Sequence, residues 1–295
     1  MNILVIGGTG HVGKFLCEIL KERGHEVTIA TRSGNAPEGM KAVVCDSADV
    51  SSLATLKDKG FDTVIEFPGH AKAVYDALSG YVKHIIACGS LWMLGAPKTV
   101  PTPAITQSPC PFAGYARRYE EIGQMLADEK CLFTAFMVPN ICGPGKIPID
   151  GLGGRDINVH KAHKRGEKVY LPDGPEPLIS PCDAYDLAMI FALAAEKPDK
   201  SGNEMFNVGP EKAITSTEFI KAYAKIYGSK IPIEYVSWEK YKNEISPSIG
   251  HWWHFYAHMC PDNTKAKELL GYIPKYTAEQ SMERAVKWMQ GEGLI

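Results

Sequence analysis

The chain has 295 residues, of which 45% are hydrophobic, so it is long enough to bury a large core. This size suits one α/β unit or two closely associated lobes. Its 32 basic and 34 acidic residues give a formal net charge of −2. Such a balance gives no electrostatic reason to expect nucleic acid or an anionic membrane as a partner.

The eight cysteines include no CxxC pair, and Cys17, Cys45 and Cys88 lie in apolar runs where thiols pack as small hydrophobic groups. We therefore expect a reduced, cytoplasmic protein without a zinc site. The opening MNILVIGG has no basic leader, which argues against a signal peptide. The apolar run 187–195 is far short of the ~20 residues that span a bilayer. The basic stretch 160–168 is interpreted as a solvated helix face.

The first half of the chain alternates short apolar runs with helical patterns. Between the first two runs, Phe15, Leu16, Ile19 and Leu20 form one face of a helix that stops at Gly24. Strands and helices that alternate at this spacing predict an α/β fold with a doubly wound parallel sheet. The predicted strands are 2–6, 26–30, 41–45, 62–67, 82–87 and 132–138.

The second half is richer in glycine and proline and less regular. A strand and turn at 170–183 precede a predicted buried helix at 186–196. Two capping boxes, at 215–218 and 277–280, predict the starts of two more helices. We expect a dinucleotide-binding domain over 1–145, with 176–200 returning to it, and a lobe formed mainly by 146–295 that binds substrate.

A glycine-rich turn follows the first predicted strand. Gly7, Gly10 and Gly13 recur every three residues, with His11 and Val12 between them, before an amphipathic helix. Glycine allows a tight turn, a close approach of the backbone to a pyrophosphate, and close packing of helix on strand. The helix N-terminus also offers free N–H groups to phosphate. The context predicts a dinucleotide site.

The end of the second strand indicates which dinucleotide is bound. An acidic residue there contacts the ribose of NAD, whereas this chain has Thr31 followed by Arg32. We therefore expect NADP(H) in preference to NAD(H), with Arg32 on the 2′-phosphate. Asp46 is expected near the adenine amino group. The rest of the expected cofactor site is formed by Pro68, Gly69 and Pro139.

These elements resemble the extended short-chain dehydrogenase/reductase family, which includes NAD(P)-dependent epimerases and dehydratases and has a Rossmann fold. The likeness runs along essentially the whole chain. Besides the glycine turn, it rests on ACGSLWMLG, PCPFAGYARRYEE, MVPNICGPG, AYDLA, FNVGP and NTKAKELLGYIPK. The third of these is contracted and lacks the arginine of the family's strand-six element.

The resemblance implies that Ser90 hydrogen-bonds the substrate oxygen and that Tyr115 exchanges its proton. In the family a lysine four residues after the tyrosine holds the nicotinamide ribose and promotes ionisation of the phenol, but here that position is Tyr119. A free tyrosine has a pKa of about 10, so its phenolate is rare at neutral pH without a nearby positive charge. The sequence thus departs from the family at the catalytic helix.

Three explanations stay open. Arg118, at i+3 from Tyr115, could replace the lysine, although a guanidinium is not a point charge. Alternatively, the bound cofactor supplies enough electrostatic field to promote ionisation of Tyr115 without the lysine. In the third, proton transfer at Tyr115 is not used, and the protein is a non-catalytic NADP(H)-binding sensor or scaffold. The leading expectation is an oxidoreductase or epimerase acting on a carbonyl or hydroxyl of a small molecule, with nucleotide sugars among the candidates. The family's habit of pairing helices makes a homodimer the expected assembly.

Other candidates carry weaker signals. Asn140 is expected to contact substrate, and Trp92 to line its pocket. His70 is interpreted as a helix-capping or solvated residue in preference to an acid or base. The three histidines within 251–260 are interpreted as part of an aromatic wall or subunit contact in preference to a metal site.

Overall fold

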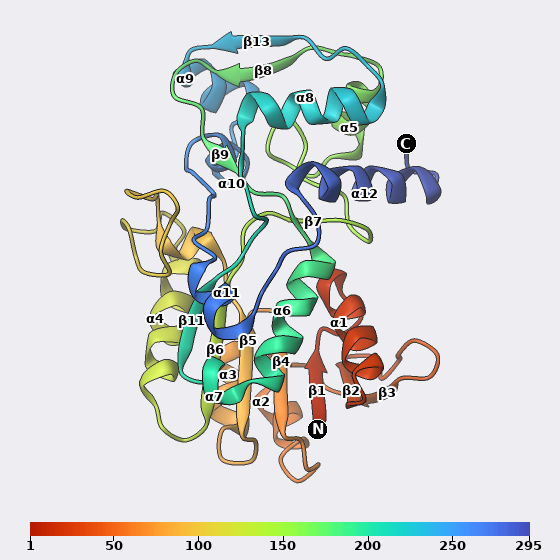
Figure 1. Cartoon of the computed structure of the whole chain (residues 1–295), viewed down its shortest axis with the longest axis vertical. Coiled ribbons are helices and arrows are strands. Elements are labelled where there is room, and N and C mark those ends of the chain that lie inside the picture. Colours follow the sequence, from red (N-terminus) through yellow and green to blue (C-terminus); the bar gives the residue numbers. More distant parts are fainter.

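The computed structural model describes residues 1–295. Its main feature is a parallel sheet in the order β11-β6-β5-β4-β1-β2-β3 (Figure 1). The order reverses direction next to β1, as in a doubly wound sheet, so the predicted fold class is confirmed. The strands are β1 (Asn2–Ile6), β2 (Glu26–Thr31), β3 (Lys41–Val44), β4 (Thr63–Glu66), β5 (His84–Cys88), β6 (Leu132–Met137) and β11 (Glu204–Asn207).

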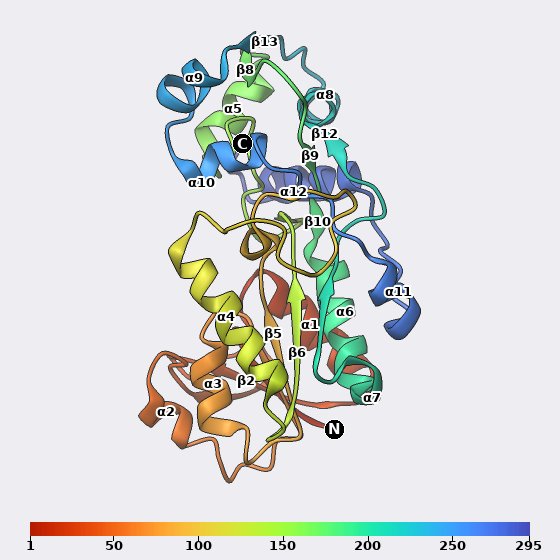
Figure 2. The same ribbon diagram turned by 90° about the vertical axis from the view of Figure 1, so that its left-hand side faces the viewer.

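Helices cover both faces of this sheet (Figure 2). On one face α1 packs against α6, and their apolar residues share a core with β1 and β2. On the other face α3 lies between α2 and α4 over a second core. The helices are α1 (His11–Glu22), α2 (Val50–Ala54), α3 (Ala71–Leu78), α4 (Ala113–Ala127) and α6 (Ala184–Glu196), with the short helices η1 (Leu91–Leu94) and α7 (Pro198–Ser201).

A smaller group of elements lies above the carboxyl ends of the strands and has its own core (Figure 1). Three two-stranded ladders, β7–β10, β8–β13 and β9–β12, replace a larger sheet here. The strands are β7 (Ile141–Cys142), β8 (Val169–Pro172), β9 (Leu178–Ile179), β10 (Cys182–Asp183), β12 (Ile214–Thr215) and β13 (Ile233–Val236). The helices of this lobe are α5 (Ile157–Lys164), α8 (Ser216–Tyr227), α9 (Trp238–Lys240), η2 (Tyr241–Ile245), α10 (Ile249–Trp252), η3 (Trp253–Phe255) and α12 (Ala278–Gly291). Helix α11 (Thr264–Leu270) instead packs beside β11, α6 and α7 and contributes to the core of the sheet (Figure 1).

Most local predictions agree with these elements. Each of the six predicted strands overlaps a strand of the sheet, and both capping boxes form, at Thr215–Glu218 and Thr277–Gln280. The interpretation of 160–168 as a solvated helix face is wrong in part. His160 and His163 are buried there, because their rings pack on Tyr223 of α8.

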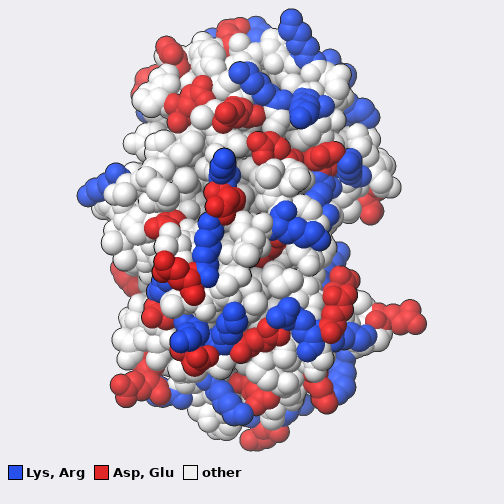
Figure 3. All heavy atoms as spheres, in the orientation of Figure 1, with Lys and Arg blue, Asp and Glu red and all other residues white.

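None of the helices is long and apolar enough to cross a bilayer. On the face drawn in Figure 3, basic and acidic side chains are interspersed over both halves of the molecule. The near-zero net charge therefore does not hide a large patch of one sign on that face.

Candidate functional site

A cavity of about 350 Å³ lies between the strand ends and the smaller lobe. Ligands bind at this edge in open α/β sheets. Its lining joins residues from the glycine turn, the ends of β4, β5 and β6, helix α4, and the segments after β7. The lining residues are His11, Phe67, Cys88, Gly89, Ser90, Trp92, Tyr115, Arg118, Val138, Pro139, Asn140, Ile141, Lys146, Ile149, Arg155 and His254.

The glycine turn has the close packing that a dinucleotide site requires. Gly7 has φ +87°, and a Cβ on Gly13 would lie 2.2 Å from the Gly7 carbonyl oxygen. No side chain caps the N-terminus of α1 at Gly10, so its first N–H groups remain available to an anion. The turn therefore fits the pyrophosphate of a nicotinamide dinucleotide.

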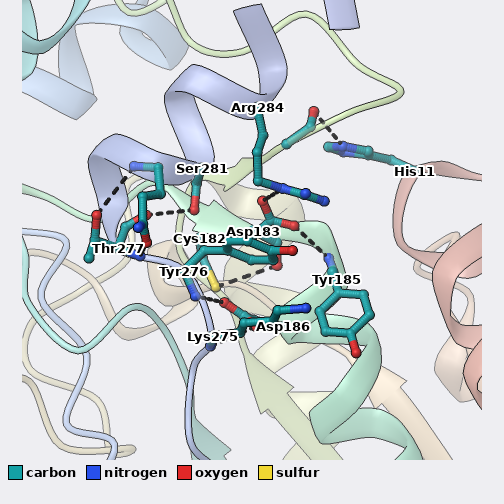
Figure 4. A network of polar contacts seen from close by, with 12 residues as sticks. His11, Cys182, Asp183, Tyr185, Asp186, Lys275, Tyr276, Thr277, Ser281 and Arg284 are labelled. Carbon is teal, nitrogen blue, oxygen red and sulfur yellow. Dashed lines mark hydrogen bonds and ion pairs between the residues drawn. The ribbon is translucent and has the colours of Figure 1, made fainter. Parts of the chain in front are cut away.

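His11 connects this turn to the smaller lobe. Its Nε2 lies 3.2 Å from the Gly143 carbonyl oxygen, so this nitrogen carries the proton and donates it. Gly143 packs on the Asp183 carboxylate, which accepts hydrogen bonds from Arg284 of α12 and from the Tyr185 N–H, both at 2.9 Å (Figure 4). Burial lowers the pKa of His11 to about 4, which keeps the ring neutral at pH 7.

The three residues predicted to be catalytic line the same cavity. Ser90 caps η1, where its Oγ accepts the Trp92 N–H at 3.2 Å. The Arg118 guanidinium carbon lies 5.9 Å from the centre of the Tyr115 ring, within cation–π range. Tyr119 lies outside the lining, and its hydroxyl accepts the Thr106 N–H at 3.2 Å. Arg118 is thus the cation next to Tyr115.

Two further cations line the opposite side of the cavity, and the sequence analysis missed both. Arg155 donates to the carbonyl oxygens of Ile147 and Ile141 at 2.5 and 2.9 Å, which fixes its guanidinium. Lys146 has no hydrogen-bond partner or ion pair, and partial burial followed by repulsion from Arg155 lowers its pKa. No Asp or Glu lines the cavity. This side can therefore attract an anionic group.

The 150–156 loop positions Arg155. The buried Asp150 carboxylate accepts N–H groups of Leu152, Gly154 and Asp156 at 2.8 to 3.2 Å, so the loop is folded around one side chain. No periodic pattern marks such a loop, although an aspartate next to glycines is a signal for a turn.

Aromatic rings close one end of the cavity. Trp92 stacks on Phe112 at 4.7 Å and lies 4.9 Å from His254, and Trp253 packs against Phe112. Burial lowers the pKa of His254 to about 3, so this ring is neutral at pH 7, and its Nδ1 has no partner. His254 and Trp92 therefore form part of a wall that combines ring stacking with a free polar atom. No group of three or more His, Cys, Asp or Glu side chains is placed to hold a metal.

The remaining predicted residues are divided between the cavity and its surroundings. Asn140 is buried, and its Nδ2 has no partner, so it can donate to a ligand in the cavity. Arg32 is exposed, and Asp46 Oδ1 accepts the Ala48 N–H. Val12, in the first turn of α1, is buried in the core between this helix and the sheet. Pro139 lines the cavity, whereas Pro68 and Gly69 form the loop after β4.

His70 does not cap α3 with its side chain. Its ring Nδ1 lies 2.9 Å from the Ser47 hydroxyl, and the residue is exposed. His70 thus occupies the N-cap position of α3 without a side-chain capping hydrogen bond, and the solvated interpretation agrees with its exposure.

Comparison with known proteins adds an independent finding. Residues 3–84 match the family model described as the NAD dependent epimerase/dehydratase family. The resemblance to this family is confirmed. The matched segment contains the glycine turn and the first four strands of the sheet, which is the part that forms the candidate dinucleotide site. A nicotinamide dinucleotide is the cofactor that this match supports.

Relatives extend the likeness over the whole chain. UDP-glucose 4-epimerase of Corynebacterium glutamicum is 23% identical over 94% of this chain and 92% of that protein. Chloroplast stem-loop binding protein of 41 kDa b from Arabidopsis thaliana is 25% identical over 100% of this chain and 80% of that protein. The crystal structure of UDP-glucose 4-epimerase from Bifidobacterium longum with NAD⁺ and UDP superposes with a TM-score of 0.77, at 19% identity, covering 100% of this chain and 99% of that one. The structural match shows a shared fold.

Proposed function

We propose that the protein is an NADP(H)-dependent oxidoreductase or epimerase that acts on a carbonyl or hydroxyl of an anionic small molecule, with nucleotide sugars among the candidates. One observation carries the proposal. A single cavity joins Ser90, Tyr115 and Arg118 at the strand ends to Lys146 and Arg155, two cations without a carboxylate partner. The proposal includes a homodimer and the division into a cofactor domain (1–145) and a mainly substrate-binding lobe (146–295).

The chain's own groups have definite parts in this chemistry. A bound nicotinamide supplies or accepts hydride at the substrate carbon. Ser90 Oγ orients the substrate oxygen by a hydrogen bond, and the Tyr115 hydroxyl gives or takes the proton on that oxygen. The Arg118 guanidinium stabilises negative charge that develops on the tyrosine oxygen. Asn140 and Lys146 hold the anionic part of the substrate.

The choice of NADP(H) rests on the end of β2. No acidic side chain follows this strand directly, and the exposed Arg32 is free of an ion pair, so it can donate hydrogen bonds to a 2′-phosphate. The Bifidobacterium structure contains NAD⁺, which makes the cofactor preference of this chain a direct question for measurement.

A second candidate function is cofactor binding without turnover. It is favoured by the absence of the family's lysine and by the likeness to the Arabidopsis protein, which is named as a stem-loop binding protein. Both functions need the glycine turn, so binding of NADPH does not separate them.

Turnover with paired tyrosine variants separates the two functions. A panel of ketones, sugars and nucleotide sugars is offered with NADPH or NADP⁺. The absorbance of the reduced nicotinamide reports net oxidation or reduction, and chromatography of the products reports epimerisation, which leaves the cofactor unchanged. We expect Tyr115→Phe to lower kcat by about 100-fold or more, since it removes the proton donor. Tyr119→Phe is the matched control, because its hydroxyl lies outside the cavity, and it should keep kcat within about twofold. Equal activity of the two variants would contradict the mechanism.

A further inference from the structure

A buried carboxylate lies at the edge of the candidate site. Glu66, the last residue of β4, is fully buried between β1 and β5, where it pairs in register with Ile6 and Ala87. A carboxylate in this position is costly unless its oxygens are satisfied and its charge is compensated. The groups that compensate the charge of Glu66 must therefore lie close to it.

One oxygen of Glu66 closes the loop that leads into α3. Oε1 accepts the N–H groups of Gly69 and His70 at 2.6 and 2.7 Å. Oε2 is buried and has no hydrogen-bond partner. A neutral amide oxygen could also accept the two N–H groups, although more weakly than a carboxylate, so the negative charge strengthens the loop closure but is not required for it.

Arg118 lies against the same loop. A Cβ on Gly69 would be 3.0 Å from the guanidinium carbon of Arg118, so the guanidinium packs directly on the residue whose N–H binds Glu66. Its Nη2 donates to the Cys88 carbonyl oxygen at 3.0 Å, one residue beyond the strand partner of Glu66. The negative and positive groups therefore occupy neighbouring strand ends.

We propose that Glu66 is the counter-charge of Arg118 and acts as a positioning residue that holds the guanidinium beside Tyr115 and the strand ends. The inference rests on the proposed function for the role of Arg118. It adds that the half-buried cation in place of the family's lysine is compensated by a buried carboxylate across the Gly69 loop, without a direct ion pair between the two side chains. Removing either partner then disturbs the other.

The titratable and charged groups around Glu66 come from three elements. Arg118 belongs to α4, His70 to the start of α3, and the Cys88 thiol to β5. Burial raises the pKa of Glu66, while the two loop N–H groups, Arg118 and His70 lower it again. Without Arg118 the pKa of this carboxyl rises further. A raised carboxyl pKa in the folded state costs stability as pH rises through it and costs nothing below the unfolded value.

A double-mutant cycle tests the pair without any substrate. Thermal unfolding of the full chain is followed at pH 5 and pH 8 for Glu66→Gln, Arg118→Met and the double variant. We expect Arg118→Met to lower Tm by about 5 °C or more at pH 8, and by less than half of that at pH 5, because without Arg118 the pKa of the carboxyl rises and less of it is charged at the lower pH. In the Glu66→Gln background, the same substitution should cost little at either pH.

Two further variants serve as controls. Arg118→Lys keeps the charge and should stay near the wild-type Tm at both pH values. Glu121→Gln makes the same chemical change in a surface pair, Arg117–Glu121 at 3.5 Å, and should shift Tm by about 1 °C or less.

The outcomes separate this proposal from the proposed function. Additive losses in the cycle, or an equal Tm loss for Arg118→Met at pH 5 and pH 8, overturn the pair even in an active enzyme. Coupling in a protein without turnover supports the pair and counts against the proposed function.

Discussion

The two sides of the cavity are built in different ways. On the sheet side, the ends of regular strands and one helix place backbone groups, Ser90 and Tyr115, and the one cation there lies beside the buried Glu66. On the other side, loops place Lys146 and Arg155, and neither has a carboxylate partner. Under the proposed function, the sheet side serves the cofactor and the reacting oxygen, and the loop side determines which anionic substrate is held.

The largest predicted effect is on cofactor affinity and concerns Arg32, which follows β2. Arg32→Ala removes the proposed contact with the 2′-phosphate, and a charge-assisted contact of this kind contributes about 1.5–3 kcal/mol. We expect the Kd for NADPH to rise about 10- to 100-fold while the Kd for NADH stays unchanged. Titration calorimetry with both cofactors measures this. An equal change for both would show that Arg32 does not read the phosphate.

A smaller effect is expected on the loop side. Lys146→Met removes an exposed cation that has no hydrogen-bond partner, so the fold should be unaffected. We expect the KM of an anionic substrate to rise about 5- to 10-fold with kcat nearly unchanged, because the contact is partly screened by solvent.

The control for this variant is Lys161→Met. Lys161 is exposed on α5, and the cavity lining does not include it. A general effect of lost positive charge would change KM equally in both variants and would contradict a specific anion site at Lys146. A rise in KM confined to Lys146→Met, and greater at low ionic strength, would sharpen the division between the two sides.

The same division explains how much the sequence could predict. The strands, the glycine turn and both capping boxes depend on neighbouring residues, so periodicity and spacing reveal them. Lys146 and Arg155 were missed because a long-range fold brings them to the cavity, and the Asp150 loop that fixes Arg155 has no period. The exposed interpretation of 160–168 was wrong for His160 and His163, since nothing in the local pattern shows that α8 covers them.

The last prediction concerns stability instead of ligand binding, and it compares two buried histidines, one from each half. Burial lowers the pKa of His163 in α5 and of His84 in β5 to about 4. An unfolded histidine has a pKa of about 6.5, so below that value the unfolded chain binds protons that the folded chain does not. The contribution of each neutral ring to the free energy of unfolding is therefore fully present above pH 6.5. It is lost as pH falls toward 4, by on the order of 2–3 kcal/mol for each ring.

Glutamine variants measure these contributions. His163→Gln keeps an acceptor for the Gly151 N–H, and His84→Gln keeps a donor for the Thr134 hydroxyl, so each removes mainly the titration. We expect each variant to lose a few °C less in Tm than the wild type between pH 7 and pH 5. An unchanged pH dependence would contradict the buried neutral ring. If the two halves unfold together, both variants alter the same unfolding transition. If the smaller lobe unfolds first at low pH, two transitions appear, and His163→Gln alters only the earlier one. The reason is that the His163 ring packs within the core of that lobe.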